Sequence, residues 1–316
     1  MFLTVPIQPL NVTYNSVEER PFILVMPFNP NATYTAWSAD QDYLVGWKVR
    51  YTPPGELYPR TFEATQDHSD QAPRIGGSSY WIDLGINNRW RMFDGLNNSR
   101  TVSTDEENGD IEVHVELDRR ANVLYLFGLR NVYEVSVLQK VDGSYVSNQL
   151  VNLSTTLSPV GWWSWLYGER DYVTSCAIPL IGNYLDQTVE VFMRGSGFAE
   201  CAQLMLGKSR DIGHTEQGAG PRLQSFSTFA PDEFGVYNYV KRGNTRVGSY
   251  TVTTPINEFD RVFRLVERLE GDLVILDANN EGTSFDSIRH YGKIVDFSPS
   301  LSYEDSAYDI KIEGIN

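Results

Sequence analysis

Histidine and cysteine are too few and too scattered in this 316-residue chain to suggest a catalytic or metal-binding site. The sequence contains no Gly-x-Ser-x-Gly nucleophile motif, no phosphate-binding loop and no His-Glu-x-x-His zinc motif. None of the four histidines has a second histidine or a cysteine at the spacing of a metal-ligand pair: His68, His114, His214 and His290. We therefore predict a protein with no enzymatic activity, no metal and no cofactor.

Carboxylates are the one plentiful reactive group, and they gather in Thr104–Asp110 (TDEENGD) and Ala230–Gly235 (APDEFG). Polysaccharide hydrolysis needs two carboxyl groups facing each other across a cleft, roughly 5–10 Å apart. Because the chain has 41 acidic residues, acidic neighbours occur easily by chance, and both segments have the composition of exposed turns. A hydrolase of the cell envelope is therefore kept only as a third hypothesis.

The net charge of −15 argues against nucleic acid as a partner, because an acidic surface repels phosphate backbones. No run approaches the ~18 consecutive apolar residues of a membrane span, and the first residues lack the basic and apolar stretches of a secretory signal. We expect folding in a cytoplasm. Cys176 and Cys201 each lie in a strand-like run, and we interpret them as buried hydrophobic residues, with a bridge between them left open.

The stretch Tyr80–Gly95, YWIDLGINNRWRMFDG, combines aromatic rings and charges more densely than a surface or a plain core strand does. We interpret it as a seam between two folded units, with the rings pointing inward and its arginines paired with Asp83 or Asp94. The alternative is a sugar cleft lined by Trp81, Trp90 and the two arginines. The expected seam residues are Arg89, Trp90, Arg91, Phe93 and Asp94.

A second aromatic cluster, WWSWLYG at 162–168, would form a sticky surface patch if it were exposed, and monomeric proteins avoid such patches. Aromatic residues and arginine dominate the energetically important parts of protein interfaces. We favour a subunit interface here, ahead of a core position and of a ligand site. The residues concerned are Trp162, Trp163, Trp165, Tyr167 and Arg170.

Composition and periodicity divide the chain into four segments. Residues 1–33, punctuated by five prolines, predict an N-terminal arm that lies against something else, such as a neighbouring subunit. Residues 34–85 predict a small aromatic β unit, and residues 86–207 predict a β-sandwich of the jelly-roll kind, because short strands recur there with turns between them. Residues 208–316 predict a C-terminal α+β assembly domain.

Periodicity supplies the strongest evidence for individual elements. The run IEVHVEL (111–117) alternates apolar and polar residues, as a half-buried strand does. Residues 256–271 place apolar side chains on one face of a helix, with Asn257 as the expected cap and Gly271 at its end. The predicted fold class is therefore mainly β, with one amphipathic helix.

A pattern of aromatic and small residues in 34–85 is similar to small carbohydrate-binding modules of the chitin-binding type. It is carried by Trp37, Tyr43, Gly46, Val49, Tyr51, Phe62, Ala64, Pro73 and Trp81, and it departs from the modules at Trp47, where they usually have Asp. The resemblance implies rings that stack on sugar faces, although so small a unit needs most of its rings as core. The candidate stacking residues are Trp37, Trp47, Tyr51, Tyr58 and Trp81.

Four motifs spread over most of the chain resemble, in their order, a family of tail proteins of tailed bacteriophages and prophages. They are WIDLGINNRWRMFDG, LGKSRDIGHTEQGAG, DEFGVYNYVKR and the terminal YGKIVDFSPSLSYEDSAYDIKIEGIN, in which Ile315 replaces the usual Leu. The resemblance implies a structural virion component of the tail, synthesised in the host cytoplasm and assembled with copies of itself and other tail proteins. The resemblance would place the protein at the tail tube, at the collar, at the baseplate or where fibres attach. The alternative is an adhesin or short tail fibre that contacts host surface glycans.

Overall fold

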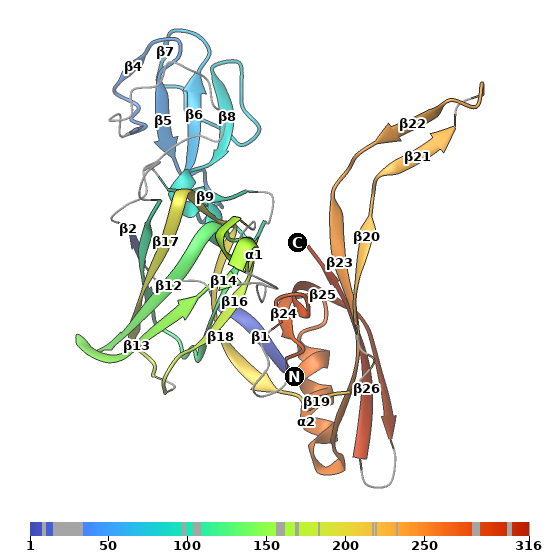
Figure 1. Ribbon diagram of the computed structural model, residues 1–316. Coiled ribbons are helices and arrows are strands. Elements are labelled where there is room, and N and C mark those ends of the chain that lie inside the picture. Colours follow the sequence, from blue (N-terminus) through green and yellow to red (C-terminus); the bar gives the residue numbers. More distant parts are fainter. Residues whose placement is uncertain are drawn as a thin grey trace.

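The computed structural model describes residues 1–7, 11–14, 34–96, 99–103, 109–155, 162–167, 171–182, 184–216, 218, 220–231, 233–279, 285–301 and 305–315. The predicted mainly β fold is confirmed. Figure 1 shows a small β module at the top, a β-sandwich beneath it on the left, and a C-terminal unit on the right from which a long hairpin projects.

The sandwich is formed by a six-stranded sheet packed against one end of a ten-stranded sheet. Side chains from both sheets, such as Val113 and Val191 from the first and Leu124 and Leu204 from the second, meet in one buried cluster. The six-stranded sheet has the order β13 (Ser144–Asn152), β12 (Arg130–Val141), β17 (Gln187–Cys201), β10 (Ile111–Leu117) and β2 (Asn11–Tyr14), with β9 (Thr101–Val102) paired to β17.

The ten-stranded antiparallel sheet continues from the sandwich into the C-terminal unit. Its order is β16 (Cys176–Pro179), β11 (Val123–Phe127), β18 (Gln203–Asp211), β1 (Phe2–Ile7), β24 (Leu273–Asp277), β25 (Arg289–Leu301), β26 (Asp305–Gly314), β23 (Asn244–Pro255) and β19 (His214–Thr215), and β20 (Gly220–Ser225) also pairs with β23. The boundary that we expected at residues 207 and 208 therefore falls inside β18 and inside a shared sheet.

The beginning of the chain differs from the arm that we predicted for residues 1–33. Strand β1 lies between β18 and β24 and joins the two halves of the large sheet, while β2 pairs with β10. Leu3 and Thr4 are buried. Pro6 is accommodated because β24 covers only Phe2–Thr4, so the missing N–H of the proline faces no partner on that side.

The C-terminal unit packs the predicted amphipathic helix on the large sheet. Helix α2 (Phe259–Arg268) follows a short 3₁₀ turn, η2 (Ile256–Glu258), and buries Val262, Leu265 and Val266 against strands β23, β24 and β26. Asn257 does not cap the helix as expected, because the N-cap position is occupied by Glu258, which makes no side-chain capping bond.

The small module closes around aromatic side chains. One sheet contains β3 (Thr35–Ala36), β5 (Lys48–Tyr51), β6 (Arg60–Ala64) and β8 (Trp81–Ile86), and a second pairs β4 (Asp42–Tyr43) with β7 (His68–Ser69). Tyr43, Val49, Phe62, Ala64 and Trp81 form the buried cluster. A 3₁₀ helix, η1 (Asn88–Phe93), then leads into the sandwich.

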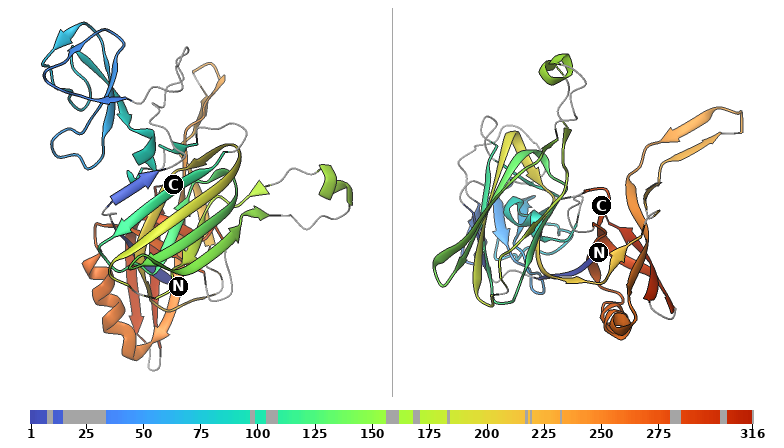
Figure 2. Two further views of the ribbon diagram at one scale, coloured as in Figure 1. Left: turned by 90° about the vertical axis from the view of Figure 1, so that its left-hand side faces the viewer. Right: turned by 60° about the horizontal axis from the view of Figure 1, so that its bottom comes forward.

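Two further pairs of strands lie outside these sheets. The pair β14 (Ser154–Thr155) and β15 (Asp171–Tyr172) brackets the short helix α1 (Trp162–Tyr167). The pair β21 (Thr228–Pro231) and β22 (Tyr237–Val240) forms the outer part of the long hairpin. Figure 2 shows both the helix and the hairpin standing away from the body.

Candidate functional site

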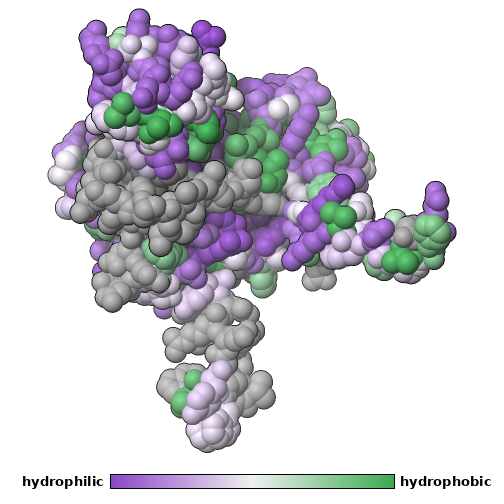
Figure 3. Space-filling view, turned by 90° about the horizontal axis from the view of Figure 1, so that it is seen from above, coloured by the Kyte–Doolittle hydropathy of each residue, from purple (hydrophilic) through white to green (hydrophobic). Residues whose placement is uncertain are grey.

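The long hairpin, defined here as residues 220–244, exposes an unusual density of apolar side chains. Its base is formed by β20 on β23, and its outer part by β21 and β22, which pair only with each other among the described residues. Figure 3 shows hydrophobic residues at the end of the hairpin, on the right. The large apolar residues that it exposes are Leu223, Phe226, Phe229, Phe234, Val236, Tyr237, Tyr239 and Val240.

Three rings share one face of the outer hairpin. Phe229 lies opposite Tyr239 in the strand register, and its ring stacks on that of Tyr237 with centroids 4.6 Å apart. Phe234, at the turn, is 90% exposed. An isolated two-stranded hairpin is at best marginally stable in water, so this aromatic face has the character of a surface that a partner covers.

Sequence reasoning did not identify this segment as a projecting hairpin. It predicts APDEFG only as an exposed turn, and not as the tip of an element that stands away from the body. The available signal was the alternation of rings and polar residues in STFAPDEFGVYNYV, which predicts two short strands around that turn. The pattern does not reveal that, in the part of the chain that the structure describes, no second sheet covers the aromatic face.

The aromatic helix α1 is also exposed. Trp162, Trp163 and Tyr167 are 63%, 58% and 71% exposed, and the ring of Trp163 stacks on both of the others. A core position is therefore wrong for these three residues. The side chain of Trp165 and the whole of Arg170 lie outside the described residues.

The small module turns most of its candidate sugar-stacking rings inward. Trp81 is 1% exposed and donates its indole N–H to the Gln71 carbonyl oxygen at 2.7 Å. Trp37 and Tyr51 are half-buried against the same cluster, whereas Trp47 is the most exposed ring of the five, at 42%. Tyr58 instead stacks on Trp90, with ring centroids 5.4 Å apart.

The segment Tyr80–Gly95 runs from the core of the module to the core of the sandwich. Trp81 belongs to the first cluster, and Met92 and Phe93 belong to the second, with Trp90 packed against it. Arg91 is buried and donates its Nε–H to the Ile86 carbonyl oxygen at 3.0 Å. Burial lowers the pKa of Arg91 to about 10, although the carboxylate of Asp94 opposes this shift.

Asp83 has a different partner from the one that we predicted. Its carboxylate accepts two hydrogen bonds from Arg60, one at 3.1 Å from Nε and one at 2.9 Å from Nη2, rather than from Arg89 or Arg91. Burial alone would raise the pKa of Asp83, but the hydrogen bonds from Arg60 and from the amides of Gly76 and Gly85 lower it. Arg60 lies on the neighbouring strand β6, a cross-strand proximity that sequence spacing does not reveal.

A cleft of about 320 Å³ lies where the module meets η1. Its lining includes Trp37, Arg50, Tyr51 and Trp90. The sugar cleft that we considered was lined by Trp81, Trp90 and two arginines of the seam. The observed cleft keeps Trp90, but it has Trp37 and Arg50 in place of the other residues. Aromatic rings beside a guanidinium are suited to stacking on a sugar and bonding to its hydroxyl groups.

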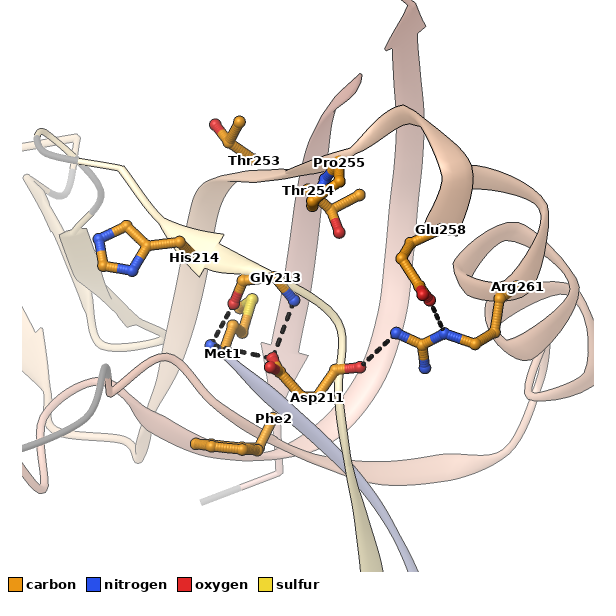
Figure 4. A pocket seen from close by; sticks show the side chains of 10 residues that line it. All are labelled: Met1, Phe2, Asp211, Gly213, His214, Thr253, Thr254, Pro255, Glu258 and Arg261. Atoms are coloured by element: carbon orange, nitrogen blue, oxygen red, sulfur yellow. Dashed lines mark hydrogen bonds and ion pairs between the residues drawn. The ribbon is translucent and has the colours of Figure 1, made fainter. Parts of the chain in front are cut away.

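A cavity of about 590 Å³ lies at the start of β1 beside β19 and η2 (Figure 4). Its charged groups are engaged with one another: the Met1 amino group donates to the Gly213 carbonyl oxygen and lies 3.8 Å from Asp211, while Arg261 bonds to Glu258 and to the Asp211 carbonyl oxygen. Burial lowers the pKa of the Met1 amino group. The arrangement is that of a charge-balanced structural joint.

A buried polar network ties the sandwich to the C-terminal unit. Arg289 pairs with Asp277 at 3.0 Å and donates to the Ser175 carbonyl oxygen at 3.1 Å. Next to this pair, the Tyr250 hydroxyl and His290 Nε2 are 2.5 Å apart, and burial lowers the pKa of His290 to about 4. Because its members bond to one another and to backbone on both sides of the joint, we assign this network a structural role.

Both cysteines are free thiols buried in the sandwich core, which answers the question of a bridge between them. Burial raises the pKa of Cys176 and of Cys201 to about 12.

Among the described residues there is no cluster of three metal-ligating side chains. The acidic run at 104–110 lies mostly outside those residues. Among all the residues that the structure describes, no helix is long and apolar enough to cross a membrane.

Searches of this chain against models of protein families, against curated proteins and against solved structures found no match.

Proposed function

We propose that this protein is a non-enzymatic structural component that works by assembling with copies of itself and with other proteins. The observation that carries the proposal is the long hairpin, whose rings Phe229, Phe234, Tyr237 and Tyr239 are all more than 60% exposed on an element that projects from the body. Burial of such side chains between subunits supplies the driving force of association. Symmetry then repeats each contact around the assembly.

The setting that we propose is the tail of a bacteriophage particle, on the strength of the motif resemblance described above. The acidic character of the chain, with a net charge of −15, suits a protein that stands close to packaged DNA without binding to it. Projecting apolar elements on a body of packed sheets suit a protein that is held by its neighbours.

The test of assembly is a concentration series by analytical ultracentrifugation on the full chain. A matched variant replaces residues 226–242 by a short Gly–Asn–Gly turn, which leaves the paired base of the hairpin in place. We expect the native chain to self-associate and the variant to sediment as a folded monomer. A native chain that is monomeric at every concentration would contradict self-assembly. The proposed setting is tested separately, by searching for the protein in purified tail particles with mass spectrometry.

A second candidate function is recognition of surface glycans by the small module. It is favoured by the cleft of about 320 Å³ that Trp37, Tyr51 and Trp90 line beside Arg50. A polysaccharide pull-down with the native chain and with Trp37→Ala tests it, because the cleft should lose affinity when that ring is removed. Absence of binding to any glycan, or equal binding by both chains, would exclude the cleft as the site.

A further inference from the structure

The outer part of the long hairpin gathers its rings on one face. Residues opposite each other in an antiparallel pair point to the same side of the ribbon, and the register places Phe229 opposite Tyr239. The next pair on this face joins Pro231 to Tyr237. All four residues are exposed. The described strands provide no second layer over this aromatic face, although a ribbon of two strands needs one to be stable in water.

The charge of the hairpin changes sign along its length. Its two acidic residues, Asp232 and Glu233, belong to the sequence of the turn, whereas its three basic residues lie toward the base: Arg222, Lys241 and Arg242. Glu233, Lys241 and Arg242 are exposed, and none of them forms an ion pair with a described residue. The aromatic face is therefore flanked by negative charge toward the tip and by positive charge toward the base.

The two kinds of charge are equally far from the centre of the aromatic face, which lies between the two residue pairs described above. Glu233 follows Pro231 by two residues, and Lys241 follows Tyr239 by two residues. Each charge is therefore about three positions from the centre, roughly 10 Å along the strand. A half-turn about this centre exchanges the position of the negative charge with that of the positive charge, so the face is complementary to itself.

A second apolar surface of the C-terminal unit does not suit the hairpin. A groove of about 370 Å³ between α2 and β25 is lined by apolar residues such as Phe263 and Phe297. The charged residues that line it are acidic: Glu267, Glu270 and Asp296. They would repel the acidic turn of a hairpin that entered the groove. The aromatic face of a second hairpin, in contrast, offers apolar surface together with the opposite order of charges.

We propose that the long hairpins of two copies pack face to face and antiparallel, around a two-fold axis at the centre of the aromatic face. The rings of Phe229, Tyr237 and Tyr239 then form the interior of a two-layer unit. Glu233 of each copy lies beside Lys241 of the other. Because both copies use the same surface, the contact closes on a dimer. This inference rests on the proposed function as an assembling protein and names the surface and the orientation of one contact.

The projection of the hairpin leaves room for a second copy. Figures 1 and 2 show it standing away from the packed sheets. Its base contains the six residues of β20, which separate the aromatic face from the body by roughly 20 Å of strand. The tip of the partner therefore reaches Lys241 before it meets the body of the first copy.

Thiol cross-linking tests the orientation of the contact. Copies carrying Glu233→Cys are mixed with tagged copies carrying Lys241→Cys and treated with a short bifunctional maleimide, and the cross-linked dimers are separated by size on a gel. The native Cys176 and Cys201 are buried and do not compete. The control replaces Lys241→Cys by Leu150→Cys, at an exposed position on β13 of the sandwich. We expect mixed 233–241 dimers to exceed 233–233, 241–241 and 233–150 dimers.

A charge exchange tests the same contact in solution. Glu233→Lys or Lys241→Glu alone places like charges together twice in each dimer, so we expect either one to weaken association about tenfold. The two substitutions in one chain exchange the charges and should restore association. Tyr237→Ser, at the centre of the face, should weaken it about 30-fold. Asn238→Ser, on the opposite face of the same strand, is the matched control and should leave it unchanged. These side chains are exposed in the isolated chain, so folding should be retained.

The outcomes separate the two proposals. Self-association without an excess of 233–241 dimers, or without restoration by the exchanged charges, would overturn the antiparallel pair of hairpins and leave structural assembly standing. Self-association of the variant that lacks residues 226–242 would do the same. A chain that remains monomeric at every concentration would remove both proposals. Preferential 233–241 cross-linking together with restoration by the exchanged charges would support both.

Discussion

The small module and the long hairpin are both rich in aromatic residues, yet they place them in opposite environments. In the module, Tyr43 on β4 meets Trp81 on β8 with ring centroids 5.2 Å apart, and both are buried. In the hairpin, Phe229 and Tyr237 stack at a similar separation of 4.6 Å, but both are more than 60% exposed. The difference lies in the number of layers, since a second sheet closes over the rings of the module, whereas no sheet of the described residues covers those of the hairpin. Aromatic density alone therefore does not distinguish a core from an interface.

The largest effect that this comparison predicts is on the stability of the module. Trp81→Ala should lower the free energy of unfolding by about 4 kcal/mol, because it removes the largest side chain of a small core and the bond to Gln71. Phe234→Ala in the hairpin should change it by less than about 0.5 kcal/mol. Chemical denaturation of the two variants measures both values. A large loss from Phe234→Ala would mean that the hairpin packs on its own chain and would break the comparison.

The same contrast between buried and exposed sites applies to the ion pairs. Asp277→Ala should cost about 3–5 kcal/mol, because it leaves the guanidinium of Arg289, whose side chain is 2% exposed, buried without its carboxylate. The control is Asp260→Ala, which breaks an exposed pair with Arg264 on α2 and should cost less than about 0.5 kcal/mol. If thermal melts showed the same loss of stability for both variants, burial would not determine how much these ion pairs stabilise the fold.

Much of the fold could be predicted because the local patterns were strong. The alternation in IEVHVEL matches β10 in both limits and burial, and the apolar stripe of 256–271 became η2 and α2. The position of β1 could not be predicted, since FLTVPI contains nothing that specifies its two neighbours, which come from residues 203–211 and 273–277. Strand order depends on contacts between distant segments, and these leave no local signal.

The candidate surfaces were predicted only in part, for the same reason. The cluster around Trp162 could be recognised because a run of four aromatic residues in six has few uses, and its exposure excludes the core position. The partner of Asp83 was assigned wrongly, because Arg60 is adjacent in the sheet but 23 residues away in sequence. The groove between α2 and β25 could not be predicted at all, since its walls come from segments that are separate in the chain.

Acid should destabilise the joint between the sandwich and the C-terminal unit. Burial, with Arg246 adding to it and Asp277 opposing it, lowers the pKa of His290 from 6.5 to about 4. The unfolded chain therefore binds a proton that the folded chain does not bind between these values, so stability falls as the pH drops from about 6.5 to about 4. The contribution of this residue over that window is about 3 kcal/mol.

A series of urea denaturation curves from pH 7 to pH 4 measures this dependence. His290→Asn should flatten the slope over the window, because the variant has no group to titrate there. If His290→Asn follows the native curve instead, the acid dependence arises from other groups.

The smallest effect on stability is expected at α1, which extends the comparison to a third aromatic element. Trp163→Ser removes a ring that stacks on Trp162 and Tyr167 but is itself 58% exposed, so the free energy of unfolding should change by less than about 0.5 kcal/mol. The same variant should lower the fraction of tryptophan fluorescence that acrylamide quenches in the dilute chain. If α1 is an interface, quenching of the native chain should fall as the concentration is raised into the assembling range, because the partner then covers these rings. If the free energy of unfolding instead fell by more than about 1 kcal/mol, the rings of α1 would pack against their own chain, as the rings of the small module do.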